Sequence, residues 1–235
     1  MDDLVKNRVA IIPARGGSKR LPNKNTMDFY GKPMIAWTID AALESRLFDE
    51  VLVSTDSEDI ASISRSCGAS VPFLRTEYSD DYSTVSEATI HALKQLQSYN
   101  GKTYKTIVQL MANCPLRSSK SLKDQVTEFE NSNSRGSLIS GFKYGMFNPW
   151  WAHYKDENGQ YQRLHGQGDS RIRSQDLPDL FCPTGATWIS HVDRLNKYKT
   201  FYSPHYKMFE LTWHESVDID DYNDLLLAKA AFNLV

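Results

Sequence analysis

The sequence predicts an α/β fold built on a doubly wound, mostly parallel sheet. Three observations lead to this class. Short apolar, β-prone runs alternate with segments of helical periodicity from residue 9 to residue 142. The first of these runs, Val9 to Ile12, is apolar throughout, as in strands that are buried on both faces of a parallel sheet. The connections between the segments are short and suit right-handed crossovers.

Each strand is predicted from its apolar run, and each helix from a capping residue followed by apolar residues at helical spacing. In chain order, the strands are expected at residues 9–12, 50–54, 71–74, 106–111, 137–142 and 186–190. The helices are expected to begin at Pro33, at one of Thr55, Asp56 and Ser57, at Ser83 or Thr84, at Ser119 or Ser121, and at Asp220 or Asp221. Proline suits the first turn of a helix, and glycine at residue 68 ends the second one.

The alternation of strands and helices stops after residue 143. Residues 144–181 are aromatic and polar, lack helical periodicity, and contain Asn158-Gly159, a hairpin turn signal. Aromatic side chains accompanied by arginines are typical of an interface core, and an ordinary aromatic mini-core is equally compatible. The arginines are Arg163, Arg171 and Arg173. We therefore expect one domain over residues 1–235 with a β-rich insertion at about 144–181.

Composition excludes several classes of protein. The 235 residues contain 27 Lys and Arg against 29 Asp and Glu, a formal net charge of −2, which argues against a dedicated nucleic-acid binder. No run approaches the roughly 18 apolar residues of a membrane span. The N-terminal residues show no apolar segment of a signal peptide, and three widely spaced cysteines suit a reducing compartment. These features predict a cytoplasmic location and no membrane partner.

Two local segments carry most of the charge information. Residues 5–25 contain six cationic side chains and no acid, whereas residues 210–224 contain six acids and no Lys or Arg. A basic loop and an acidic loop in one chain suggest a polyanion site beside a cation site. Two unrelated solvated patches remain the alternative.

The basic segment includes a loop that follows the first predicted strand. Ligands in open α/β sheets bind beyond the carboxyl ends of the strands. Gly16 and Gly17 allow the backbone N–H groups to form an anion cradle, and Arg15, Lys19 and Lys24 can meet several phosphates. The loop matches neither GxxxxGK[ST] nor GxGxxG, which disfavours an NAD-dependent dehydrogenase. A solvated turn is the alternative.

The acidic segment contains a pair of carboxylates at alternate positions. In an extended segment Asp218 and Asp220 share one face, and two such oxygen ligands opposite a phosphate cradle suit Mg²⁺. Helix capping is the alternative, and it is stronger for Asp220 than for Asp218. The six histidines show no zinc-site spacing, and no GxSxG elbow occurs.

These residues together resemble a known family. The run from Ile12 to Lys19, with Lys24 and Asn25, closely resembles the opening signature of the acylneuraminate cytidylyltransferases, also called CMP-sialic acid synthetases. Further matches follow at residues 31–35, 53–56, 73–75, 79–81, 114–117 and 217–220. The KDO cytidylyltransferases share the opening motif, so a KDO-type enzyme is an alternative, as is a non-catalytic nucleotide-binding module of the same fold.

The resemblance implies a Rossmann-like nucleotidyltransferase in which the anomeric hydroxyl of a 2-keto acid sugar attacks the α-phosphorus of CTP and pyrophosphate leaves. It assigns the triphosphate to Arg15, Lys19 and Lys24, with Asp218 as a further catalytic residue and Asp218 and Asp220 as Mg²⁺ ligands. The other substrate-binding residues implied are Ala14, Gly16, Gly17, Ser18, Asn25, Arg75, Thr84, Met111, Arg173 and Gln175. Asn25, Arg75 and Thr84 would surround the cytidine and ribose. The family forms homodimers through the insertion, and the partner subunit reaches into the sugar site.

The sugar half departs from the family pattern. Where sialic acid enzymes commonly have Gln, Arg and Asn, this chain has Met111, Ser174 and Thr184. A thioether accepts hydrogen bonds only weakly and donates none, so Met111 cannot pair a polar substituent as an amide does. We therefore expect a modified nine-carbon 2-keto acid, such as a legionaminic- or pseudaminic-acid-like sugar, to be preferred over N-acetylneuraminate.

Overall fold

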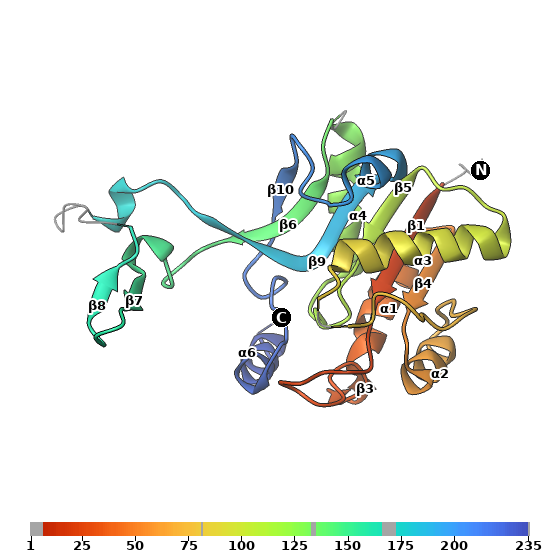
Figure 1. Cartoon of the computed structure of the whole chain (residues 1–235), viewed down its shortest axis with the longest axis horizontal. Coiled ribbons are helices and arrows are strands. Elements are labelled where there is room, and N and C mark those ends of the chain that lie inside the picture. The colour runs from red at the N-terminus through yellow and green to blue at the C-terminus, as the bar shows by residue number, and fades with distance from the viewer. Residues whose placement is uncertain (1–6, 81, 133–134, 166–172, 235) are drawn as a thin grey trace.

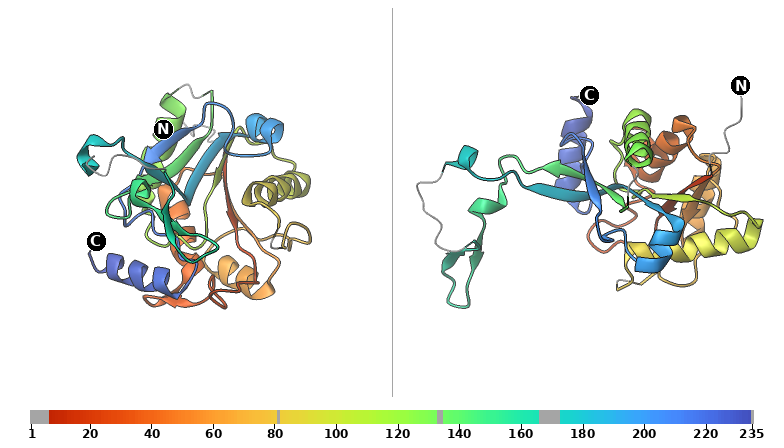
Figure 2. Two further views of the ribbon diagram at one scale, coloured as in Figure 1. Left: turned by 60° about the vertical axis from the view of Figure 1, so that its left-hand side comes forward. Right: turned by 90° about the horizontal axis from the view of Figure 1, so that it is seen from above.

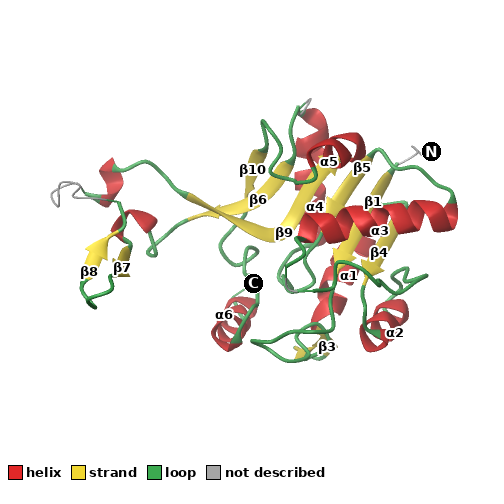
Figure 3. Ribbon diagram, in the orientation of Figure 1, coloured by secondary structure: helices red, strands yellow, loops and turns green. Residues whose placement is uncertain are grey.

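A six-stranded sheet in the order β10-β6-β9-β5-β1-β4 forms the centre of the molecule (Figures 1 and 3). The structure is a computed structural model that describes residues 7–80, 82–132, 135–165 and 173–234. The sheet strands are β1 (Arg8–Pro13), β4 (Glu50–Ser54), β5 (Thr106–Gln109), β6 (Leu138–Lys143), β9 (Phe181–His191) and β10 (Lys207–Glu210). The helices are α1 (Met34–Ser45), α2 (Glu58–Ser66), α3 (Val85–Asn100), α4 (Ser119–Asn131), α5 (Val192–Tyr198) and α6 (Tyr222–Phe232). Within the described ranges, none of them combines the length and hydropathy that a membrane span requires.

Helices cover both faces of this sheet, as in a doubly wound fold (Figure 2). Because neighbouring side chains of a strand point to opposite faces, Ile12 and Val53 pack on one side and Ile11 and Leu52 on the other. The first core joins the sheet to α1, α2 and α4, and the second joins it to α3 and α5. The predicted fold class is confirmed.

One strand departs from a purely parallel sheet. β1 pairs in parallel with β4 and β5, and β6 with β10, whereas β9 lies antiparallel between β5 and β6. The strand predicted at residues 186–190 belongs to this longer element, which begins at Phe181. Its first residues alternate between exposed and half-buried positions, so they form no continuous apolar run in the sequence.

Two expectations about secondary structure were wrong or incomplete. Residues 71–74 form no strand, because the chain makes a single bridge from Ser70 to Leu52 and then turns away. The short elements α5 and β10 were not predicted. β10 carries exposed or half-buried side chains at all four positions, so it lacks the apolar run by which the other strands were found.

Capping residues explain where most helices begin. Ser57 caps α2, and Thr84 caps α3 in a complete capping box, as the sequence predicts. Pro33 precedes the first residue of α1. Ser118 caps α4, just before the predicted serines, and Asp221 caps α6. The capping choice left open at the last helix is therefore settled in favour of Asp221.

The insertion forms an arm that projects from the sheet (Figures 1 and 2). β6 and β9 continue beyond the body and pair as far as Lys143 and Phe181. The arm contains the short helix η1 (Pro149–Trp151), the hairpin of β7 (His153–Lys155) and β8 (Tyr161–Arg163), and the short helix η2 (Ser174–Asp176). Gly159 has a φ of +77° in the hairpin turn, which confirms the turn predicted from Asn158-Gly159.

The described side chains of the arm form no buried core. None of the described residues between 144 and 181 is buried. Met146 and Phe147 are 87% and 82% exposed, and Tyr161 and Leu164 are also exposed. The aromatic mini-core that the sequence left open is therefore not formed within the described part of the arm. Arg171, one of the arginines expected at an interface, lies outside the described residues.

Candidate active site

The glycine-containing loop lies at the carboxyl edge of the sheet, where β1 ends. Hydrogen bonds to the end of β4, to the segment that follows β4 and within the loop itself fix its path. The Ala14 N–H donates to the Ser54 carbonyl at 2.9 Å, and the Gly16 N–H donates to the Asp56 carboxylate at 2.8 Å. The Asn25 amide nitrogen donates to the Arg15 carbonyl at 3.0 Å and so joins the two ends of the loop. These contacts give the loop a defined shape.

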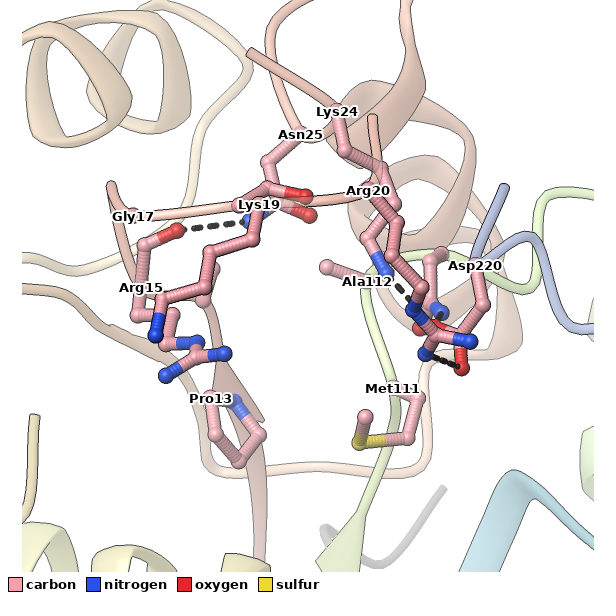
Figure 4. Close-up of a pocket in the computed structure, with 13 residues that line it drawn as sticks. Pro13, Arg15, Gly17, Lys19, Arg20, Lys24, Asn25, Met111, Ala112 and Asp220 are labelled. Atoms are coloured by element: carbon pink, nitrogen blue, oxygen red, sulfur yellow. Dashed lines mark hydrogen bonds and ion pairs between the residues drawn. The ribbon is translucent and has the colours of Figure 1, made fainter. Parts of the chain in front are cut away.

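The loop and the end of β5 enclose a cavity of about 300 Å³. Figure 4 shows Arg15 and Lys19 on one side of it, with Arg20, Lys24 and Asp220 together on the other. Four cationic side chains around one small cavity suit a ligand with several negative charges, such as a triphosphate. Of the remaining cations of the basic segment, Arg8 pairs with Glu130 at 2.6 Å instead, and Lys6 lies outside the described residues.

The acidic segment meets the basic loop at this cavity. Lys24 Nζ lies 2.8 Å from one carboxylate oxygen of Asp220, and Arg20 Nη2 lies 2.6 Å from the other. The alternative of two unrelated charged patches is therefore wrong. The buried amide of Asn113 donates to Asp218 and, at 3.3 Å, to Asp220, so both carboxylates reach the same nitrogen atom.

The two carboxylates have opposite pKa perturbations. Burial, followed by the neighbouring charge of Asp220, raises the pKa of Asp218 to about 6. Burial alone would also raise the pKa of Asp220, but its hydrogen bonds and ion pairs with Lys24 and Arg20 hold that pKa below its usual value. Burial raises the pKa of the nearby Cys114 thiol, which is therefore neutral rather than nucleophilic.

The carboxylate pair has the donor chemistry of a Mg²⁺ site. One oxygen of Asp218 and one of Asp220 accept from the same Asn113 nitrogen and are therefore neighbours, and Mg²⁺ prefers one or two carboxylates together with phosphate oxygens and water. In the described part of the chain, no group of three or more His, Cys, Asp or Glu side chains could hold a metal. The residues present fit a hard divalent cation that arrives with phosphate ligands.

Met111 lies at the end of β5 and lines the same cavity. Its N–H donates to the Gly185 carbonyl at 3.2 Å, and a Cβ atom on Gly185 would approach the Met111 side chain to 2.5 Å. Glycine is therefore required beside this methionine. The buried guanidinium of Arg117 holds the Met111 carbonyl at 3.0 Å and the Thr38 hydroxyl at 3.2 Å. These contacts fix the backbone of Met111 at the wall of the cavity.

Most of the predicted site residues come together here. Those that line the cavity are Ala14, Arg15, Gly17, Ser18, Lys19, Lys24, Asn25, Met111 and Asp220. Gly16 and Asp218 lie beside it. Gly16 stands between the lining residues Arg15 and Gly17 and donates its N–H to Asp56, and Asp218 accepts from Asn113, which lines the cavity.

Besides Gly16 and Asp218, four predicted residues lie outside this lining. Arg75 is buried beside the loop and donates to the Ser79 hydroxyl at 3.3 Å, and burial lowers its pKa. Thr84 caps α3 and lines a different cavity. Arg173 and Gln175 lie at the second short helix of the arm, where Arg173 pairs with Asp176. Their roles in substrate binding stay predictions.

Three residues at the site were not assigned from the sequence. Arg20 was counted among the cations but given no role, and Asp56 was read only as a possible helix cap. Asn113 follows the end of β5, so the rule that ligands bind at the carboxyl ends of strands could have identified it. An isolated asparagine in a loop carries no stronger signal.

Comparisons with known proteins agree with this geometry. A family model described as cytidylyltransferase matches residues 9–167. The chain is 35% identical to the pseudaminic acid cytidylyltransferase of Campylobacter jejuni over 96% of both chains, and 33% identical to the CMP-N,N'-diacetyllegionaminic acid synthase of Legionella pneumophila over the same shares. Among solved structures, a CMP:2-keto-3-deoxy-manno-octonic acid synthetase complexed with CTP has the same fold. The TM-score is 0.71 at 16% identity, covering 97% of this chain and 98% of that one.

Proposed function

The chain belongs to the cytidylyltransferase family and is a nucleotidyltransferase, and on that premise we propose that it transfers CMP from CTP to the anomeric hydroxyl of a nine-carbon 2-keto acid sugar. Pyrophosphate would be the second product. The observation that carries the proposal is one cavity at the carboxyl edge of the sheet, lined by four cationic side chains and Asp220, with Asp218 joined to Asp220 through the Asn113 amide.

The cationic side chains would bind and position the triphosphate. Arg15 and Lys19 approach the cavity from one side, Arg20 and Lys24 from the other, so the phosphates would lie between them. Fixed positive charge around the transferred phosphoryl group stabilises the charge that develops as pyrophosphate leaves. The bound geometry also replaces a bimolecular encounter with an oriented one. No covalent nucleophile is required.

Asp218 and Asp220 would hold Mg²⁺, which supplies electrostatic stabilisation of the phosphate oxygens when bound. In the structure the two oxygens of Asp220 are paired with Lys24 and Arg20. Phosphate oxygens compete with Asp220 for these two cations. Nucleotide binding would therefore release the carboxylate for the metal, which favours entry of the cation together with CTP.

The sugar is proposed from the sequence relatives and from Met111. Two relatives with 33–35% identity are named for pseudaminic and diacetyllegionaminic acid, both consistent with a modified nine-carbon acid. Met111 places a thioether where sialic acid enzymes commonly have an amide, so the cavity wall would discriminate little between sugars with and without a polar substituent at that point. A KDO-type substrate is the second candidate, supported by the fold of the KDO synthetase.

The arm supports a homodimer in which each subunit completes the sugar site of the other. Exposed apolar side chains such as Met146, Phe147 and Tyr161 are costly to leave in water, and the described part of the arm offers them no core. Arg173 and Gln175, implied as substrate-binding residues, lie on this arm. A partner subunit could bring them to the sugar.

Pyrophosphate release tests the proposed reaction. The wild-type protein would be supplied with CTP and Mg²⁺ and, in separate reactions, with pseudaminic, legionaminic, N-acetylneuraminic and KDO acids. We expect release only with a 2-keto acid sugar, fastest with a modified nine-carbon acid. The variant Arg65→Ala is a control that should react like the wild type, since Arg65 pairs with Glu58 on α2 and does not line the cavity. Absence of release with every sugar would contradict the proposal, and release with KDO alone would favour the second candidate.

A further inference from the structure

Asn113 lies between the two acidic residues of the site and contacts both. Its side-chain nitrogen donates to the Asp218 carboxylate, to the Asp220 carboxylate at 3.3 Å and to the Ile219 carbonyl at 2.9 Å. Asn113 is 2% exposed, so these bonds are made out of contact with bulk water. Lys24 and Arg20 form ion pairs with Asp220, whereas the amide of Asn113 donates to both carboxylates.

The orientation of the amide is determined by its surroundings. All three partners are carboxylate or carbonyl oxygens, which accept hydrogen bonds, so the nitrogen rather than the oxygen of the amide must face them. The backbone fixes the same pair of segments, because the Ile219 N–H donates to the Asn113 carbonyl at 3.0 Å. Asn113 and Ile219 therefore exchange hydrogen bonds in both directions, which locks the end of β5 to residues 218–220.

Two carboxylates at such a short separation repel each other unless positive charge or donors lie between them. The two N–H groups of one amide provide donors without adding a cation that would compete with a metal. The Asp218 oxygen that accepts from Asn113 keeps a further lone pair for a divalent cation, whereas the Asp220 oxygen that accepts from Asn113 also accepts from Lys24, so a cation there would take the place of Lys24. Partners in this outer position orient the ligands of metal sites and tune the affinity.

We propose that Asn113 is a positioning residue that holds the Asp218 and Asp220 carboxylates together as a preformed divalent-cation site. This inference rests on the proposed function, in which these carboxylates bind Mg²⁺. Asn113 lines the cavity, but its amide nitrogen faces the two carboxylates, so we assign it to the ion rather than to the nucleotide or the sugar. Its contribution is to fix the two ligands before the ion arrives, so its removal should weaken ion binding more than nucleotide binding.

The test compares Mn²⁺ binding to wild-type protein, Asn113→Leu and Gln125→Leu, measured by the electron paramagnetic resonance of free Mn²⁺ with and without CTP. Leucine keeps the approximate shape of asparagine and removes the donors. Gln125 is the matched control, because it is a fully buried amide on α4 that donates to Ser121. We expect Asn113→Leu to bind Mn²⁺ about 10- to 100-fold more weakly, with Gln125→Leu unchanged and the affinity for metal-free CTP unaffected in both.

A second variant guards against failure of Asn113→Leu to fold. Asn113→Asp keeps the shape but places a third carboxylate against the other two, so its melting temperature should fall without ions and rise with Mn²⁺ by more than that of the wild type. Equal Mn²⁺ affinity in wild type and Asn113→Leu, or equal Mn²⁺-induced shifts in wild type and Asn113→Asp, would overturn the inference and leave the proposed function standing. A wild-type protein that binds no Mn²⁺ even with CTP would overturn both the inference and the metal part of the proposed function. The transfer reaction itself is tested separately, by pyrophosphate release.

Discussion

Asp218→Asn is expected to stabilise the ion-free protein at neutral pH even though it should abolish turnover. Burial, reinforced by the charge of Asp220, raises the pKa of Asp218 from 3.8 to about 6. A pKa difference of one corresponds to about 1.36 kcal/mol, so ionising Asp218 costs up to about 3 kcal/mol more in the folded protein than in the unfolded chain. Asparagine removes this cost because it carries no charge.

The direction of the pH dependence follows from the raised pKa. Because the folded state favours the protonated carboxyl, the stabilising contribution of Asp218 is complete below about pH 4 and is lost as the pH rises through about 6. The variant should therefore match the wild type near about pH 4 and exceed its free energy of unfolding at about pH 7.

Urea unfolding followed by circular dichroism in the presence of EDTA measures this difference. EDTA is required because a bound cation would stabilise the ionised carboxylate. Asp28→Asn, a substitution of an exposed carboxylate in the two-residue strand β2 (Asp28–Phe29), is the control and should show no such trend. An Asp218→Asn variant that is equally or less stable than the wild type at both pH values would refute the reasoning that burial makes ionisation of Asp218 unfavourable in the folded protein.

The remaining predictions concern the phosphates, the metal, the arm and the sugar. Arg15→Ala or Lys24→Ala should lower kcat/KM by about 10²-fold, as expected for one charge-stabilising group, while the fold stays intact by circular dichroism; near-wild-type kinetics would remove the loop from the active site. EDTA should abolish turnover and added Mg²⁺ should restore it, and undiminished activity in EDTA would mean that the Asp218–Asp220 pair holds no essential metal. Light scattering at micromolar concentration should give a dimer, and a fully active monomer would exclude assembly through the arm. Met111→Gln should change KM for the sugar acid and leave KM for CTP nearly unchanged in competition assays, and a wild-type preference for N-acetylneuraminate that the substitution does not alter would refute the role of Met111.

The parts of the fold that the sequence predicts are those with local signals. β1 and β4 are continuous apolar runs, and Ser57 and Thr84 are capping residues whose side chains bond within their own first turn. The antiparallel direction of β9 and its extension into the arm depend on pairing with β6, which lies far away in the sequence. The strand expected at residues 71–74 does not form, again because of tertiary pairing: an apolar run becomes a strand only where a neighbouring strand offers it a continuous edge for hydrogen bonds.

The site follows the same division between local and tertiary information. Arg15, Lys24, Asp218 and Asp220 were found because their charges cluster along the chain, and the edge of the sheet then brings the two clusters together. Asn113 was missed because its role depends on three acceptors from residues 218–220, which are distant in sequence.

A ³¹P NMR spectrum of the reaction tests the central claim most directly, because it reports both phosphorus-containing products at once. The wild-type protein would be incubated with CTP, Mg²⁺ and a modified nine-carbon 2-keto acid sugar. The proposed reaction predicts that the CTP signals are replaced by equal amounts of pyrophosphate and of a phosphodiester that links CMP to the sugar. Unchanged CTP, or hydrolysis to CDP and inorganic phosphate without a phosphodiester, would contradict it.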